Sequence, residues 1–91
     1  MLVEEQEKHI YERLRQERER LHLSQLDLSY EAGLSQNMIT YIEKGKRTPS
    51  LTTLLKLCNA MKIDPSVLFL NHDEEKEQAK QQVIEIIQKY M

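Results

Sequence analysis

The chain has 91 residues, of which 40% are hydrophobic and 31% are charged, and its formal net charge at pH 7 is −2. This composition is typical of one small soluble globular domain and excludes a fibrous or disordered chain. No apolar run approaches the roughly 20 residues of a membrane-spanning helix, and no signal peptide is visible. The single cysteine, Cys58, cannot form a disulfide within the chain. We therefore expect a cytoplasmic protein with no membrane partner.

The acidic balance does not extend over the whole chain. Residues 1–7 hold three glutamates and no base, and residues 71–91 hold five acids against three lysines. The intervening residues 8–70 therefore carry a charge of +3 within the total of −2. We interpret residues 1–8 as an acidic extension of the first helix, residues 9–70 as one folded domain and residues 71–91 as a separate C-terminal element.

The first third of the chain predicts two helices. The first covers about residues 4–20, with apolar residues spaced for one face and opposite charges spaced by four. Residues 21–23 interrupt this charged pattern and predict a buried connection. Ser24 is a typical N-cap, with Asp27 three residues later as a short capping-box acid. A second helix should therefore cover residues 25–32 and end at the glycine that follows.

A third helix is predicted over residues 36–44. Ser35 is its expected N-cap, and Gly45 should end it by adopting a positive φ. Ile39 and Ile42 are spaced to point into the core.

Serine and aspartate also precede the later helices. Ser50 should cap a fourth helix, and Asp64, followed by proline, should begin a short fifth helix that ends at Leu70. Residues 74–90 predict a sixth, amphipathic helix with apolar residues spaced by threes and fours. The predicted apolar side of the fourth helix is Leu51, Leu54, Leu55, Leu57, Cys58 and Met61. The fold class is therefore all-α, a compact five-helix domain plus a C-terminal amphipathic helix.

Two short helices joined by a glycine-containing turn form a helix-turn-helix unit, and residues 25–32 and 36–44 have this arrangement. The ordered motifs around them also resemble the DNA-binding domains of the Cro and phage-repressor-like (Xre) family. The resemblance covers about residues 9–70 and implies a repressor-like helix-turn-helix fold. It rests on Leu14-Arg15, Arg18, Leu23-Ser24-Gln25, Ala32-Gly33-Leu34-Ser35, Ile39, Ile42-Glu43, Gly45, Pro49-Ser50 and Leu54-Leu55-Lys56-Leu57.

The resemblance implies that residues 36–44 form a recognition helix whose first residues meet base edges in the major groove of DNA. We predict base contacts from Gln36, Asn37, Met38 and Tyr41. The two amides each present a donor and an acceptor together, which suits bidentate contact with adenine. The methionine suits contact with a thymine methyl group. Tyr41 is large for a groove-facing position, so it either meets a base or reaches a phosphate through its hydroxyl.

A second set of side chains is predicted to hold the DNA backbone. Gln25 lies at the start of the preceding helix, where its amide and the helix N-terminus favour a phosphate. Cations follow the recognition helix and would clamp the neighbouring strand, although they could equally be solvated loop residues. The predicted phosphate contacts are Gln25, Ser35, Thr40, Lys44, Lys46, Arg47 and Thr48.

The resemblance also implies an ion pair between Arg18 of the first helix and Glu43 of the recognition helix. The alternative is two separate solvated charges. Independently of the resemblance, periodicity predicts that Leu28, Leu34, Ile39 and Ile42 are core residues.

No catalytic or metal-binding pattern stands out in the sequence. His9, His22 and His72 have no metal-ligand spacing with one another or with Cys58. No serine has the context of a nucleophile, and there is no glycine-rich phosphate loop. We therefore predict no enzyme activity, no metal and no cofactor, and we place Cys58 in the core.

The C-terminal element has two competing uses. It would either fold back over its own domain or pair with a second subunit. Because a dimer reads two half-sites about one helical turn apart, we predict a homodimer. The predicted dimer interface is Leu68, Phe69, Ala79, Val83, Ile86, Ile87 and Tyr90.

The sequence thus predicts a transcriptional repressor that binds a palindromic operator in double-stranded DNA as a homodimer. Restriction-modification controllers, phage-type repressors and antitoxins share this compact plan, and the sequence does not choose among them. The alternative is an adaptor or anti-repressor that keeps the fold and binds a protein partner through the C-terminal helix. Mutations in the recognition helix distinguish the two, because only the DNA-binding regulator needs that surface.

Overall fold

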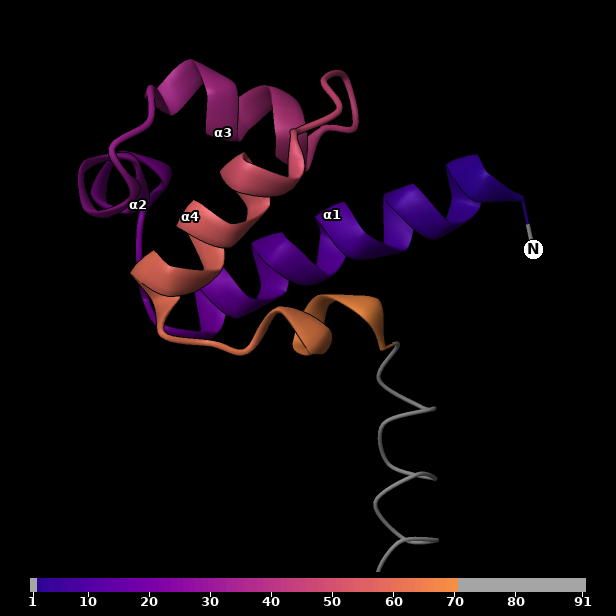
Figure 1. Cartoon of the computed structure of the whole chain (residues 1–91). Coiled ribbons are helices and arrows are strands. Elements are labelled where there is room, and N and C mark those ends of the chain that lie inside the picture. The colour runs from indigo at the N-terminus through magenta and orange to yellow at the C-terminus, as the bar shows by residue number, and fades with distance from the viewer. Residues whose placement is uncertain (1, 71–91) are drawn as a thin grey trace, which may run out of the picture.

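The computed structural model describes residues 2–70, which form four α-helices and a final 3-10 helix (Figure 1). The five elements are α1 Val3–Arg20, α2 Gln25–Ala32, α3 Gln36–Glu43, α4 Leu51–Met61 and η1 Pro65–Phe69. The all-α class is confirmed, and the predicted fifth helix is the 3-10 helix η1. The predicted sixth helix and its residues Ala79, Val83, Ile86, Ile87 and Tyr90 lie outside the described residues.

Side-chain caps begin the helices where the sequence predicts them. Ser24 Oγ accepts a hydrogen bond from the Asp27 N–H at 2.9 Å, and the Asp27 carboxylate accepts one from the Ser24 N–H at 3.2 Å. Ser35 and Ser50 likewise accept bonds from the N–H groups three residues later, each at 3.1 Å. Each cap satisfies an N–H group that has no partner within its own helix.

Glycines at positive φ end α2 and α3. Gly33 (φ 68°) and Gly45 (φ 73°) adopt the left-handed conformation that glycine reaches without strain. After α3, the Gly45 N–H bonds to the Ile42 carbonyl and the Lys46 N–H bonds to the Tyr41 carbonyl, both at 2.9 Å. This pair of bonds turns the chain sharply, so α3 ends one residue before the predicted position.

The connection over residues 21–23 is only partly buried, which corrects the prediction. His22 is exposed and takes a φ of 58°, while Leu21 and Leu23 are half-buried against the core. The Leu23 N–H bonds to the Arg18 carbonyl at 3.1 Å, so the chain turns at His22 as it does at the glycines. The turn directs the flanking leucines inward and leaves the imidazole in solvent.

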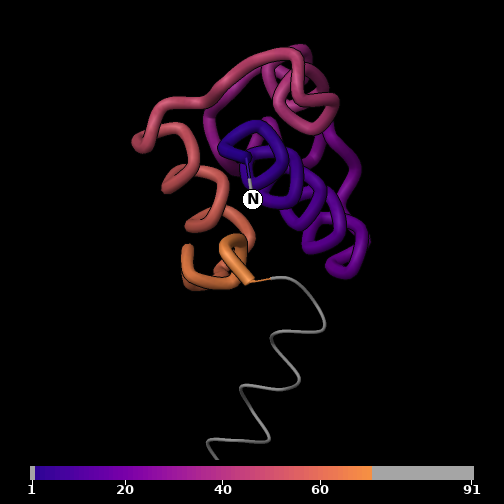
Figure 2. Tube along the Cα trace, turned by 90° about the vertical axis from the view of Figure 1, so that its right-hand side faces the viewer, coloured from indigo at the N-terminus to yellow at the C-terminus, as the bar shows by residue number. Residues whose placement is uncertain are grey.

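One hydrophobic core joins the five elements. In this core α2 packs against α3 and α4, while η1 packs against α1 and α4. Figure 2 shows η1 beside the last turn of α4. Leu34 is half-buried at the edge of the core. Cys58 lies inside the core, and its burial raises the pKa of the thiol above its ordinary value. The buried core residues are Tyr11, Leu14, Leu28, Ile39, Ile42, Leu57, Cys58, Met61 and Leu68.

Two leucines of α4 do not join this core, contrary to the sequence prediction. Leu51 is 71% exposed and Leu55 is 40% exposed, whereas Leu57 is fully buried. The sequence pattern assigns all three leucines to the apolar side of α4, but the neighbouring elements cover only part of that side. The apolar stripe of α4 is therefore wider than the surface that the described residues bury.

The short element η1 begins at an aspartate cap, as predicted. The Asp64 carboxylate accepts a hydrogen bond from the Ser66 N–H at 2.9 Å, and hydrogen bonds from Ser66 hold the pKa of Asp64 below its ordinary value. Leu68 is only 2% exposed, whereas Phe69 is 61% exposed. Leu68 therefore belongs to the core of its own chain and offers almost no surface to a second subunit, which corrects its assignment to a dimer interface.

Lys62 provides a direct test of the helix-end geometry. It ends α4 at a φ of 56°, a conformation that is unfavourable for a residue with a Cβ atom. We expect Lys62→Gly to stabilise the protein by about 0.5–1 kcal/mol, which would raise the melting temperature by about 2–8 °C in a thermal scan. Lys56→Gly, the same change inside α4, should destabilise it by about 1 kcal/mol. Equal effects of the two changes would contradict this account.

Candidate nucleic-acid interface

The outer face of α3 carries three of the predicted base-contact residues. Ile39 and Ile42 are fully buried and fix which side of α3 faces the core. Gln36, Asn37 and Tyr41 are exposed, and Tyr41 shows 47% of its surface to solvent. Two amides and a phenol thus share one accessible helix surface that begins at the N-terminus of α3.

Met38 differs from its predicted position on that surface. It is half-buried and packs against the hydrophobic core. It lies four residues before Ile42 on the helix, so the packing that buries Ile42 also draws Met38 inward. The outer face of α3 is therefore more polar than the sequence reading suggests.

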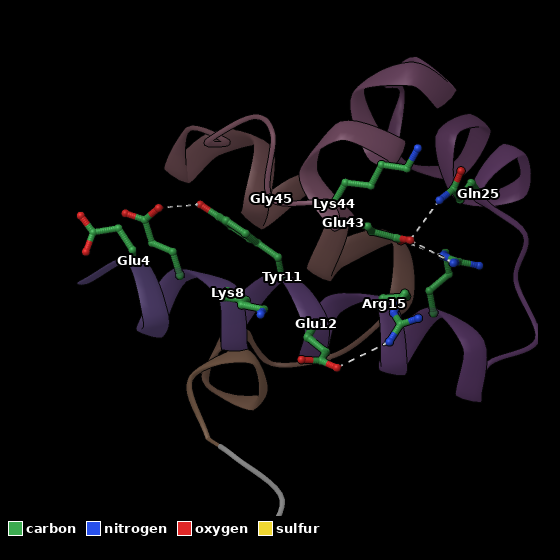
Figure 3. Close-up of a pocket in the computed structure, with 11 residues that line it drawn as sticks. Glu4, Lys8, Tyr11, Glu12, Arg15, Gln25, Glu43, Lys44 and Gly45 are labelled. Carbon is green, nitrogen blue, oxygen red and sulfur yellow. Dashed lines mark hydrogen bonds and ion pairs between the residues drawn. The ribbon is translucent and has the colours of Figure 1, made fainter. Parts of the chain in front are cut away.

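Gln25, a predicted phosphate contact, is held between α2 and α3. Its Oε1 accepts a hydrogen bond from the Thr40 hydroxyl at 2.6 Å, and its Nε2 donates to Glu43 Oε1 at 3.1 Å (Figure 3). Thr40 Oγ1 also lies 3.1 Å from the Gln36 carbonyl, to which it can donate. An amide NH₂ has two hydrogens, so one hydrogen of Gln25 remains for a phosphate. The predicted phosphate contact at Thr40 is half-buried and already engaged.

Arg18 and Glu43 form a bidentate ion pair between α1 and α3. Arg18 Nε and Nη2 donate to the two carboxylate oxygens of Glu43 at 2.8 and 3.0 Å, and Arg18 Nη1 donates to the Leu23 carbonyl at 2.8 Å. The side chains are only 11% and 3% exposed. Hydrogen bonding to Glu43 raises the pKa of Arg18 above its ordinary value. The pair implied by the family resemblance is thus a buried link that fixes α3 on the domain.

The loop after α3 presents the predicted cations to solvent. Lys44, Lys46 and Arg47 are exposed, as is Thr48. Within residues 2–70 no ion pair engages any of the three cations. Ser35, at the other end of α3, is also exposed, and its hydroxyl oxygen accepts the N-terminal cap bond from the Met38 N–H. Uncompensated positive charge therefore lies next to the exposed amides.

Sequence reasoning missed a second buried carboxylate, Glu17 of α1. Glu17 is 7% exposed and pairs with Arg13 at 3.2 Å and with Arg20 at 2.7 Å. The spacings of four and three residues are those of neighbours on a helix, so the pairs could have been predicted. The burial of Glu17 could not, because it depends on how α1 packs.

The part of the chain that the structure describes offers no group of three or more histidine, cysteine, aspartate or glutamate residues able to hold a metal ion. None of its helices is both long and apolar enough to cross a membrane.

Comparison with known proteins agrees with this geometry. A family profile described as "Helix-turn-helix" matches residues 14–68. The restriction-modification controller protein C.AhdI from Aeromonas hydrophila is 37% identical, with a TM-score of 0.67, over 71% of this chain and 97% of that chain. A hypothetical transcription factor NHTF from Neisseria has a TM-score of 0.74 over 86% of this chain and 91% of that chain, and at 19% identity this likeness concerns the fold alone. No curated protein sequence matches the chain.

The matched residues include the whole two-helix unit, the buried ion pair and the α3 surface described above. The chain therefore belongs to the Xre-like helix-turn-helix family of DNA-binding transcription regulators.

Proposed function

We propose that this protein is a sequence-specific repressor that binds a palindromic operator as a homodimer, with α3 in the major groove. The observation that carries the proposal is the outer face of α3, where exposed amides are followed by three exposed cations that no ion pair within residues 2–70 engages. In this proposal the protein acts by binding DNA in the cytoplasm and not as an enzyme.

Base reading is assigned to Gln36 and Asn37. They lie at the N-terminus of α3, the end of a recognition helix that meets base edges in the major groove. Each amide can form a bidentate contact worth about 1–3 kcal/mol of discrimination against a wrong base. Tyr41 lies one turn further along and meets either a base or a phosphate.

Backbone contacts are assigned to the loop after α3 and to the start of α2. Lys46 and Arg47 are exposed and available to phosphates, and Gln25, at the start of α2, keeps one amide hydrogen that is not used in its bond to Glu43. Such contacts set affinity and register but not the choice of sequence. Each neutralised phosphate should add about −0.9 to the slope of log K against log salt.

The dimer and the biological setting are proposed from two further observations. Phe69 is an exposed apolar residue at the end of the described chain, next to residues 71–91, which we propose to complete the interface. Identity of 37% to a restriction-modification controller favours that role over phage-type repressors and antitoxins.

Selection of binding sites from random duplex DNA tests the proposal. The parent should enrich an inverted repeat. Gln36→Ala/Asn37→Ala should lose or change the preferred bases, whereas Arg47→Ala should keep the preference and lower the salt slope by about 0.9. If the parent enriches no sequence at low salt, groove reading by α3 is wrong, and the adaptor alternative becomes the better account. An enriched site without two-fold symmetry would contradict the homodimer.

A further inference from the structure

Two hydrogen bonds hold the side-chain amide of Gln25 at its two ends. Its Oε1 lies 2.6 Å from the Thr40 hydroxyl oxygen. Its Nε2 lies 3.1 Å from Glu43 Oε1, and Figure 3 shows that Glu43 is itself held by Arg18. An amide group is planar, so these two bonds and the attachment of the side chain to α2 fix the direction of the second N–H bond.

The chemistry of the two neighbours allows only one orientation of this amide. A carboxylate only accepts hydrogen bonds, so Glu43 faces the NH₂ end of Gln25 and not its carbonyl oxygen. The amide oxygen carries no hydrogen, so the Thr40 hydroxyl is the donor in the contact at the other end. If the amide were rotated by half a turn, its oxygen would lie against the carboxylate with no hydrogen between the two oxygens.

The Thr40 hydroxyl has one hydrogen and two acceptors within reach. The Gln36 carbonyl lies 3.1 Å away, which is farther than the Gln25 oxygen at 2.6 Å. The shorter contact takes the hydrogen, so Thr40 donates to the amide of α2 and not to the backbone of its own helix. Its side chain therefore has no second hydrogen for a phosphate, and its role in DNA binding is through Gln25.

We propose that Thr40 is a positioning residue for DNA binding, whose hydroxyl holds the Gln25 amide in the orientation in which its unused N–H binds a backbone phosphate. The proposal rests on the proposed function, which assigns a phosphate contact to Gln25. Because the amide is already ordered in the free protein, less side-chain entropy is lost when the phosphate binds. The contact raises affinity for all sequences alike, because it is made to the backbone and not to base edges.

Full-length variants at Thr40 test the proposal, with binding to the selected operator measured by fluorescence anisotropy. Thr40→Val keeps the shape of the side chain but removes the hydroxyl, and we expect it to weaken binding about three- to ten-fold, which is the scale of one hydrogen bond. Thr40→Ser keeps the donor and should retain most of the affinity. Because Gln25 carries no charge, the slope of log K against log salt should stay the same in both variants. Thr52→Val, the same change at an exposed threonine of α4, is the control and should bind like the parent.

A double-mutant cycle separates positioning from direct contact. If Thr40 acts through Gln25, Thr40→Val should change affinity by less than about two-fold in a Gln25→Ala background, because the interaction between the two side chains is then already lost. A direct contact of Thr40 with the phosphate, or a general weakening of the fold, gives the same loss with and without Gln25.

Three results would overturn the proposal. They are an undiminished loss from Thr40→Val in the Gln25→Ala protein, parental affinity of Thr40→Val itself, and parental affinity of Gln25→Ala. In each case the parent still selects an operator, so the proposed function stands without the positioning role. Failure of the proposed function has a different signature, because the parent would then select no sequence at all, and both proposals would be wrong. Thermal scans check that each variant is folded.

Discussion

Arg18→Ala is expected to lower the free energy of unfolding by about 3–5 kcal/mol, because it removes one partner of a buried ion pair. Glu43 would lose its arginine partner in a site where its side chain is only 3% exposed, and among residues 2–70 the Gln25 amide would be the side-chain donor that remains to it. The Leu23 carbonyl would also lose the bond from Arg18. For a domain of this size the loss is a large share of the total stability. Urea denaturation followed by circular dichroism measures it.

Arg15 supplies the matched control on the same helix. It pairs with Glu12 at 3.6 Å and Glu19 at 4.0 Å, but its side chain is 45% exposed. Arg15→Ala should therefore cost no more than about 0.5 kcal/mol. The paired replacement Arg18→Met/Glu43→Met should recover most of the loss, since no charge is then left unpaired. Similar losses for the two single arginine variants would show that burial does not determine the effect.

Local features of this fold could be predicted from the sequence because their causes are local. Ser24, Ser35 and Ser50 cap their helices by accepting hydrogen bonds from N–H groups three residues later in the chain, so both partners of each cap can be read from the sequence. Gly33 and Gly45 lie where a positive φ ends a helix. The exposed amides of α3 also follow from local spacing, because the buried isoleucines fix the opposite face.

Features that depend on how helices pack could not be predicted in this way. The hydrogen bonds of Gln25 join residues 15 and 18 positions away in the chain. The recognition-helix resemblance places Met38 on the DNA surface, although the side chain packs against the core. The sequence prediction places Glu4 and Glu7 in an acidic extension outside the folded domain. In the structure they line the same groove as Lys44, at the edge of the proposed interface.

Leu57→Ala and Leu51→Ala form the second pair of changes with a large predicted difference. Both leucines lie on α4, and the sequence pattern assigns both to its apolar side. Leu57 is 0% exposed, so Leu57→Ala should destabilise the protein by about 3–5 kcal/mol through lost burial and the cavity left behind. Leu51 is 71% exposed and should change stability by less than about 0.5 kcal/mol, as surface substitutions usually do.

The same pair also tests what covers the outer surface of α4. In an isolated chain the two leucine-to-alanine changes lower stability by different amounts only because the two side chains differ in burial within residues 2–70. Urea denaturation should then show a large loss of stability for Leu57→Ala and a small one for Leu51→Ala. If a second subunit covers Leu51, its replacement instead weakens association, and the apparent stability of the parent rises with protein concentration. Urea midpoints measured at two concentrations about 100-fold apart distinguish the cases. A Leu51→Ala loss as large as that of Leu57→Ala at the lower concentration would contradict the assignment of Leu51 to the surface of the single chain.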